Sequence, residues 1–289
     1  MTSSASAAAA PSGQPHVRRL IAIWLLLSVI AVPLVIFVLG PHMPPFTFSN
    51  EARDQRNVNI LLAALGTPVL IGIWVALVYS IASFRQRGPA LADGPPIRGG
   101  GRLQTVWVVA TTVVVLFLAV LGTITLLGTA KGAGGGQGPS PLAVPHGSQP
   151  TLPVQVIGQQ WAWTFRYPTY GGVETTQLAI PAGRVIALHV TSLDVNHSFW
   201  AIRLAVKADA IPGSDNVAFV RPRRPGSFKI RCAELCGLWH GHMFTTGEVL
   251  TPAAFATWIR REVVANAAAT KVLPPYATHY FPEPLRRAG

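Results

Sequence analysis

Three long apolar runs dominate the first half of the chain. Residues 20–39, 60–84 and 106–127 contain no charged residue, and each reaches the about 20 residues that an α-helix needs to cross a bilayer. The alternatives are a buried core helix for each run and a cleaved signal peptide for the first. The lengths of the runs, and the lack of a small-residue cleavage site after residue 39, favour three retained transmembrane helices. Pro33 is a candidate kink in the first.

After residue 153 the pattern changes to short segments rich in β-branched and aromatic residues, with Gly, Pro and Asn between them. This pattern predicts an antiparallel β domain over residues 153–265. The strand candidates are PVQVIGQQWAWTF, RVIALHVTS, NVAFV, SFKIRC and TTGEVL. One helix is expected at the end of the domain, because Thr251 can cap it and Pro252 suits its first position.

The remaining segments have compositions typical of connections and ends. Residues 1–19 are expected to form a disordered cytoplasmic N-terminus, and the Gly- and Pro-rich residues 128–152 are expected to form a flexible linker. Residues 266–289 form a tail without a readable motif. The predicted fold class is therefore a membrane α-helical part with three helices, followed by an all-β domain.

Charge then orients the predicted helices. The chain is 50% hydrophobic and 12% charged, with a formal net charge of +12. Such a charge can indicate nucleic-acid binding, but here many of the basic residues flank the apolar runs, and no nucleic acid is expected as a partner. Cytoplasmic loops collect Lys and Arg, which places the N-terminus and the second connection in the cytoplasm and residues after 127 outside. The arginines that carry this prediction are Arg18, Arg19, Arg85, Arg87, Arg98 and Arg102.

The segment CAELCGLWHGHM concentrates soft metal ligands. It contains both cysteines of the chain, and Cys232, Cys236, His240 and Met243 are spaced by four, four and three residues. That spacing also fits one stripe of a buried helix, although two glycines and β-branched flanks favour a loop between strands. A disulfide would leave His240 and Met243 unexplained, and Met is not a usual zinc ligand. Thiolate, imidazole and thioether together fit copper, and two cysteines could bridge two copper ions if a second histidine were near.

The segment resembles subunit II of the haem-copper cytochrome c oxidases, whose outer domain carries the binuclear copper centre CuA. Every position of that family's pattern C-x-E-x-C-G-x-x-H-x-x-M is matched, and DVNHSFW resembles the segment with the second histidine, here His197. The resemblance implies a cupredoxin-like Greek-key barrel. It also implies that Cys232 and Cys236 bridge two copper ions, that His197 and Met243 complete one, and that His240 and the carbonyl of Glu234 complete the other.

Other segments extend the resemblance. GQQWAWTF resembles the family's aromatic cluster, which implies electron entry at Trp161 with Trp163 beside it; an aromatic core strand is the alternative. KADAIPG, with Lys207 and Asp209, resembles the segment near the family's water and proton exit. The Glu234 carboxylate would reach a magnesium ion shared with subunit I. His242 and His189 lie outside the ligand pattern and are expected to be a surface or supporting residue and a structural residue, respectively.

The chain also departs from the family. Its first apolar run is additional to the usual two spans, Gln104 stands where the family has a glutamate at the entrance of one proton channel, and no C-x-x-C-H motif for covalent haem is present. The resemblance implies a subunit of a bacterial plasma-membrane oxidase, surrounded by membrane lipid and assembled with subunit I and subunit III. It would pass electrons from a separate cytochrome c to haem in subunit I, where oxygen is reduced to water and protons are pumped.

Other functions remain open at this point. A nitric oxide reductase with a CuA-bearing subunit would look the same in sequence, and a copper-delivery protein or a zinc-binding module would belong to other classes. The nature of the donor is suggested by charge. Residues 151–289 contain 14 Lys and Arg against 8 Asp and Glu, a net charge of +6. An acidic or membrane-tethered cytochrome is therefore expected.

Overall fold

The computed structural model describes residues 14–85, 100–129, 136–137 and 151–272 of the 289-residue chain. Its contacts divide the chain into two units. One contains residues 1–43 and 57–98, and the other contains residues 44–56 and 99–289.

Three helices are long and apolar enough to cross a membrane. The first, α1 (Gln14–Pro33), continues through a π-helical segment (Leu34–Leu39) and a short 3-10 helix (Gly40–His42); α2 spans Asn50–Phe84 and α3 spans Gly101–Thr129. The change from α to π geometry comes directly after Pro33. Proline lacks an N–H group and crowds the preceding turn, which disfavours regular α geometry. Very few of their side chains are buried within this chain, so their apolar surface requires lipid or partner helices.

Helices α1 and α2 are joined by a few polar contacts. The indole N–H of Trp24 donates to the carbonyl of Pro68 at 2.7 Å, and Nδ1 of His16 lies 2.9 Å from the hydroxyl of Tyr79. Gly72 provides space for the indole, because a Cβ there would lie 3.3 Å from Nε1 of Trp24. A polar group without a hydrogen-bond partner costs several kcal/mol in the hydrocarbon region. These polar atoms have partners and therefore avoid that cost.

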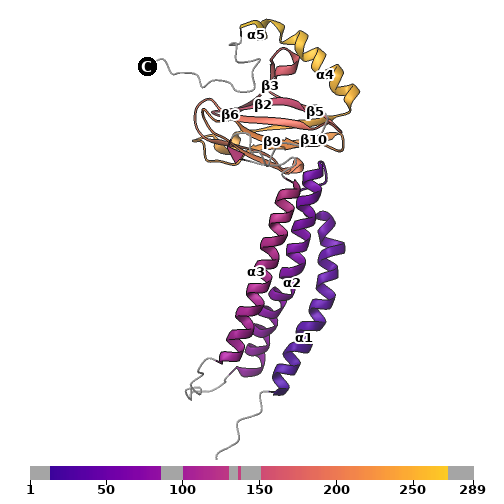
Figure 1. Ribbon diagram of the computed structural model, residues 1–289, viewed down its shortest axis with the longest axis vertical. Coiled ribbons are helices and arrows are strands. Elements are labelled where there is room, and N and C mark those ends of the chain that lie inside the picture. Colours follow the sequence, from indigo (N-terminus) through magenta and orange to yellow (C-terminus); the bar gives the residue numbers. More distant parts are fainter. Residues whose placement is uncertain (1–13, 86–99, 130–135, 138–150, 273–289) are drawn as a thin grey trace, which may run out of the picture. The chain divides into compact units, whose positions relative to one another are not determined.

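The second half forms two sheets that enclose one core (Figure 1). The six-stranded sheet has the order β1-β9-β6-β2-β3-β4, and the five-stranded sheet has the order β5-β11-β10-β7-β8. Together they form the expected all-β, cupredoxin-like domain. The strands are β1 (Gly136–Gln137), β2 (Leu152–Gln159), β3 (Ala162–Tyr167), β4 (Val173–Thr175), β5 (Leu178–Pro181), β6 (Ile186–Ser192), β7 (His197–Ala201), β8 (Val206–Ala210), β9 (Asn216–Val220), β10 (Gly226–Cys232) and β11 (Phe244–Leu250).

The core between the sheets is built from fully buried aromatic and aliphatic side chains. Phe165, Phe199 and Phe228 are each at most 2% exposed. Helix α4 (Pro252–Ala265) begins as expected, with the Thr251 hydroxyl accepting the N–H of Ala254, and buries Phe255, Trp258 and Ile259 against the sheets. The short helix α5 (Ala267–Val272) follows. Both cysteines and Met243 belong to the same buried cluster, so one end of the core carries the candidate ligands.

Residues 44–56, which comprise the connection before α2 and the first turns of α2 and are here called the docked loop, pack against the β domain within the same unit. The Ser49 hydroxyl is buried, donates to the Leu204 carbonyl at 2.7 Å and accepts the N–H of Ala52 at 2.9 Å. Backbone bonds join Asn50 to Arg221 and Arg223 to Phe48. The guanidinium carbon of Arg203 lies 4.9 Å from the centre of the Phe48 ring, a distance suited to a cation–π contact.

Several details differ from the sequence predictions. Helix α1 begins at Gln14, so residues 14–19, expected to be disordered, are helical; Arg18 and Arg19 favour helix and extend it beyond the apolar run. Strands β2 and β6 pair in parallel, as do β5 and β11, so the domain is mixed rather than antiparallel. Parallel pairs need long crossovers that periodicity does not reveal.

The domain boundaries show smaller differences. Helix α3 reaches Thr129, β1 falls within the expected linker, and α5 falls within the expected tail. The rest of the linker (130–135 and 138–150), the tail from 273 and residues 1–13 lie outside the described residues.

Candidate metal centre

Two adjacent strands bring the candidate ligands together. His197 begins β7 and Cys232 ends β10, and these antiparallel strands pair with Cys232 opposite Phe199. The connection from β10 to β11 carries Cys236 and His240, and Met243 directly precedes β11. A backbone bond from the Cys232 N–H to the Met243 carbonyl, at 3.0 Å, closes the base of this connection. We call residues 232–243 the copper loop, after the ion that the ligand pattern predicts.

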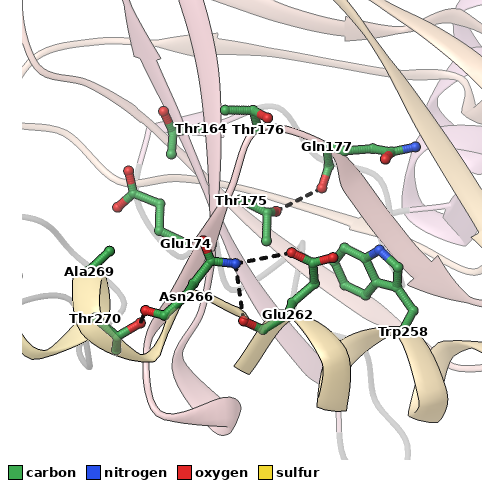
Figure 2. Close-up of a pocket in the computed structure, with 10 residues that line it drawn as sticks. All are labelled: Thr164, Glu174, Thr175, Thr176, Gln177, Trp258, Glu262, Asn266, Ala269 and Thr270. Carbon is green, nitrogen blue, oxygen red and sulfur yellow. Dashed lines mark hydrogen bonds between the residues drawn. The ribbon is translucent and has the colours of Figure 1, made fainter. Parts of the chain in front are cut away.

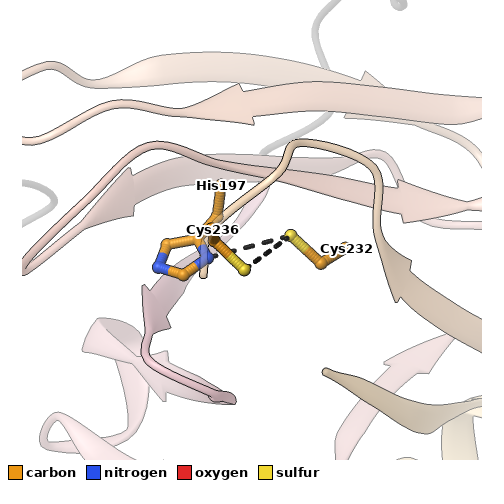
Figure 3. A group of neighbouring side chains, drawn as sticks. All are labelled: His197, Cys232 and Cys236. Atoms are coloured by element: carbon orange, nitrogen blue, oxygen red, sulfur yellow. Dashed lines mark hydrogen bonds between the residues drawn. The ribbon is translucent and has the colours of Figure 1, made fainter. Parts of the chain in front are cut away.

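The sulfur and imidazole atoms converge on a small volume (Figure 3). The two Sγ atoms are 3.8 Å apart, and Nδ1 of His197 lies 3.8 Å from Sγ of Cys232. The ligand atoms of His197, Cys232 and Cys236 all lie within 4.8 Å of one another, and all three residues are buried. Both cysteines are free thiols, so the disulfide alternative is not the arrangement found.

The other predicted donors lie against the same two sulfurs. Nδ1 of His240 is 3.5 Å and Sδ of Met243 is 3.8 Å from Sγ of Cys236, while the Glu234 carbonyl oxygen is 3.2 Å from Sγ of Cys232. The cluster thus offers two cysteine sulfurs, two imidazoles, one thioether and one carbonyl. This soft donor set fits copper, and its sulfur content is too high for a hard cation such as calcium or magnesium.

Asp194 fixes the orientation of His197. Its Oδ1 lies 2.9 Å from Nε2 of His197, and its Oδ2 accepts the backbone N–H of Gln160 at 2.7 Å. With the ring proton on Nε2, where it can be donated to the carboxylate, the lone pair of Nδ1 points toward the cysteines. Burial raises the pKa of Asp194, but these hydrogen bonds and the neighbouring imidazole outweigh it and lower that pKa from its usual value.

The two thiols have opposite proton affinities. Burial raises the pKa of Cys232, but bonds to His197 and to backbone and thiol groups outweigh it and lower the pKa to about 6. Burial and the negative charge of the Cys232 thiolate raise the pKa of Cys236 to about 12. One thiolate therefore forms readily without metal, whereas a cation is needed to stabilise the second.

Trp161 is attached to the copper loop. Its indole N–H donates to the carbonyl of Cys236 at 3.2 Å, and the side-chain amide of Gln160 donates to the same carbonyl at 2.8 Å. Trp161 is half-buried. Trp163 is buried, with its ring centre 6.0 Å from that of His197 and 5.6 Å from that of Phe199. Trp163 therefore lies in the core of the domain. An aromatic core strand was the alternative to a place beside the electron entry.

The remaining singled-out residues lie outside this cluster. Lys207 and Asp209 are exposed on β8, and the Glu234 side chain is exposed. His189, on β6, has Nδ1 2.8 Å from Oδ2 of Asp215. His242 is exposed, with its ring packed edge-on against Trp239. Gln104 is exposed in the first turn of α3.

Known proteins match the β domain and most of the chain. The family model "Cytochrome C oxidase subunit II, periplasmic domain" matches residues 173–249. Cytochrome c oxidase subunit 2 of Thermostichus vulcanus is 29% identical over 85% of this chain and 87% of its own length. Its counterpart from Synechocystis sp. is also 29% identical, over 81% and 80%. A crystal structure of the periplasmic domain of subunit II from Bradyrhizobium japonicum is 30% identical over 39% of this chain and 94% of that chain, with a TM-score of 0.38.

The chain is thus similar to the cytochrome c oxidase subunit II family over most of its length. Members of that family are copper-binding subunits of an oxidoreductase complex that works with subunit I, and the His197, Cys232 and Cys236 cluster is the corresponding candidate copper site here. Sequence reasoning did not give Asp194 or Gln160 a role at the subunit II copper site. The signal for Asp194 was its place in DVNHS, three residues before His197.

A second concave site lies between β3, β4 and the C-terminal helices (Figure 2). Its volume is about 400 Å³, and its lining includes Glu174, Glu262 and Trp258. The two carboxylates already have partners, because Glu174 pairs with Arg166 and Glu262 accepts the amide of Asn266. It shares no residue with the ligand cluster of the β domain.

Proposed function

We propose that this chain is the electron-entry subunit of a cytochrome c oxidase, holding a binuclear CuA centre that receives electrons from cytochrome c. The observation that carries the proposal is the convergence of four donor groups, from His197, Glu234, His240 and Met243, on a pair of cysteine sulfurs 3.8 Å apart. A single blue-copper site uses one cysteine. The second cysteine is therefore accounted for by a shared, two-metal site.

In this proposal, Cys232 and Cys236 would hold both copper ions between them. His197 and Met243 would add ligands to one ion, and His240 with the Glu234 carbonyl would add ligands to the other. Copper in this soft donor set would supply one-electron chemistry. The protein contributes rigidity: Asp194 holds His197, a backbone bond closes the copper loop, and Met243 is 1% exposed. Fixed ligands lower the reorganisation that accompanies electron transfer.

Trp161 is the proposed entry point for electrons. Its half-buried ring is accessible to a partner, and its N–H is bonded directly to the carbonyl of a bridging cysteine. A donor that contacts this ring is thereby connected to the copper loop through one hydrogen bond. Among the described residues, no other indole N–H is bonded to the loop.

The docked loop supports the proposed membrane topology. It connects α1 to α2 and bonds to the β domain through Ser49, Asn50 and Phe48, so the loop and the domain must share one side of the membrane. The arginine distribution places that side outside, and the N-terminus and the connection from α2 to α3 in the cytoplasm. We therefore propose a plasma-membrane subunit with a periplasmic copper domain.

The complete enzyme would include subunit I and subunit III. Subunit I would accept the electrons at haem and reduce oxygen to water, with coupled proton pumping. The exposed Glu234 side chain is the proposed ligand for a magnesium ion at the boundary with subunit I. Gln104 lacks a titratable group, so the proton route that begins at the corresponding glutamate of relatives would need another entrance.

Rapid mixing of the purified oxidase with reduced cytochrome c tests this function. The copper absorbance should change before haem in subunit I is reduced. The His197→Gln variant should lose that first phase, while haem remains reducible by a small artificial reductant. His189→Gln is the matched control, since it removes a β6 histidine outside the ligand cluster. An unchanged first phase in His197→Gln would refute the proposed route.

A further inference from the structure

An apolar groove lies between the first half of α1 and the last third of α2. Its volume is about 360 Å³, and its lining includes Ile23 and Leu27 of α1 and Trp74, Val78 and Ala82 of α2. All five of these side chains are exposed within this chain. We call this site the α1–α2 groove. Its aliphatic and aromatic lining suits an apolar ligand, because a polar group placed there would lose its hydrogen bonds to water.

Contacts on either side of the groove hold its two walls together. At the end of the helix pair, Nδ1 of His16 lies 2.9 Å from the hydroxyl oxygen of Tyr79, and the His16 ring centre lies 5.0 Å from that of Phe84. Further along α1, the indole N–H of Trp24 donates to the carbonyl of Pro68 at 2.7 Å. The groove is therefore formed before a ligand binds, which limits the entropy lost on binding.

Each wall of the groove ends in an arginine. In α1, Arg19, Ile23 and Leu27 follow one another at intervals of four residues and so lie on one face of the helix. In the other wall, Arg85 comes three residues after Ala82, directly beyond the end of α2. Both arginines are exposed, and neither forms an ion pair with any residue that the structure describes. The open end of the groove is therefore positively charged.

Charge and length together indicate a lipid as the occupant. Residues 14–42 and 55–85 contain no Asp or Glu, so these helices supply no acidic side chain to balance the two arginines. The wall from Trp74 to Ala82 rises by about 12 Å at the helical rise per residue. One leaflet provides about 15 Å, half of the hydrocarbon core. An acyl chain can thus lie along the groove while its headgroup remains at the arginines.

We propose that the α1–α2 groove binds one anionic phospholipid, with an acyl chain between the helices and the phosphate at Arg19 and Arg85. The site goes beyond the electron-transfer role and uses only the topology proposed above, which places both arginines at the cytoplasmic surface. A guanidinium suits a phosphate because it donates two parallel hydrogen bonds to it. A helix of another subunit is the alternative occupant, and it would leave the arginines without an anionic partner.

Native mass spectrometry of the purified full-length chain in detergent tests the headgroup contact. The probes are equal amounts of phosphatidylglycerol and phosphatidylcholine with identical acyl chains, and one phosphatidylglycerol should be retained in preference. Arg19→Gln and Arg85→Gln should each lower its retention about fivefold, as expected for losing one basic contact with an anionic lipid. Phosphatidylcholine retention should stay the same. Arg102→Gln is the matched control, because Arg102 is an exposed arginine at the start of α3 that does not line the groove.

Ala82→Phe tests the acyl-chain contact, since the larger side chain occupies the groove. It should lower retention of both lipids, whereas Ala110→Phe, at an exposed position of α3, should not. Circular dichroism checks that each variant keeps its helices. Equal retention of the two lipids by the unchanged chain, or an effect of Arg102→Gln equal to that of Arg19→Gln, would overturn the inference. Unchanged lipid retention in Ala82→Phe, with loss of another subunit from the purified oxidase, would assign the groove to a partner helix instead.

Discussion

Gly158, in β2, is a position where one methyl group should displace a predicted copper ligand without touching the copper loop. A Cβ there would lie 3.0 Å from Cδ2 and 3.2 Å from Cγ of His197, and 3.2 Å from Cζ3 of Trp163. Ordinary contacts of a Cβ fall at 3.4–4 Å. The Gly158→Ala variant must therefore push these rings by a few tenths of an ångström.

Neither ring can move freely. His197 is fully buried and held at Nε2 by Asp194, and Trp163 is 3% exposed. Overpacking a core costs about 1–3 kcal/mol, and replacing a strand glycine by alanine returns about 0.5–1 kcal/mol. We expect a net loss of about 1–2 kcal/mol in the free energy of unfolding. Changes in the residues that hold a metal ligand lower metal affinity by about 10–100-fold. A chelator should therefore remove copper from Gly158→Ala at a correspondingly lower chelator concentration.

The assay is chelator competition followed by copper absorbance, with thermal unfolding measured in parallel. Gly241→Ala is the matched control, because it lies within the copper loop and a Cβ there would meet nothing within 4 Å. It should retain the copper affinity of the unchanged chain. Equal affinity in Gly158→Ala, or a larger loss in Gly241→Ala, would show that packing against His197 does not set the geometry of the site.

Three further outcomes are expected. Trp161→Phe keeps an aromatic ring but removes the N–H bonded to the Cys236 carbonyl. Electron entry should slow in rapid-mixing experiments while copper content stays the same. Loss of copper would instead indicate a structural role for Trp161. Ser49→Ala removes the buried hydroxyl that caps the start of α2 and bonds to Leu204. The free energy of unfolding should fall by about 1–2 kcal/mol in denaturant titrations. No change would mean that the docked loop is not anchored there. A tag after Gly289 should be accessible to protease from outside intact cells, and a tag between residues 88 and 101 only after lysis, with the reverse pattern contradicting the topology.

The sequence was most informative where one physical requirement dominates. Uncharged runs of bilayer length predicted all three apolar helices, and the ligand spacing predicted residues that the fold brings within a few ångströms of two sulfurs. Thr251 capped its helix as expected because an N-cap depends only on local geometry. These features require few contacts between distant segments.

Contacts between distant segments account for what the sequence did not reveal. The docked loop reaches Leu204 across 155 residues, and no periodicity encodes that contact. The parallel pairing of β2 with β6 depends on a crossover. Gln160 acquires its place at the site only because the turn after β2 and the copper loop meet in space. Asp194 was visible within a motif, but its bond to Nε2 of His197 required coordinates.

Copper content and the electron paramagnetic resonance spectrum of the purified full-length chain decide whether Cys232 and Cys236 hold a metal pair. Two copper ions per chain are expected, with the hyperfine pattern of one unpaired electron shared equally by both nuclei. Cys232→Ser and Cys236→Ser should each abolish that pattern, because either change removes a bridge. One copper or one zinc per chain, or an unchanged spectrum in either variant, would contradict a binuclear centre.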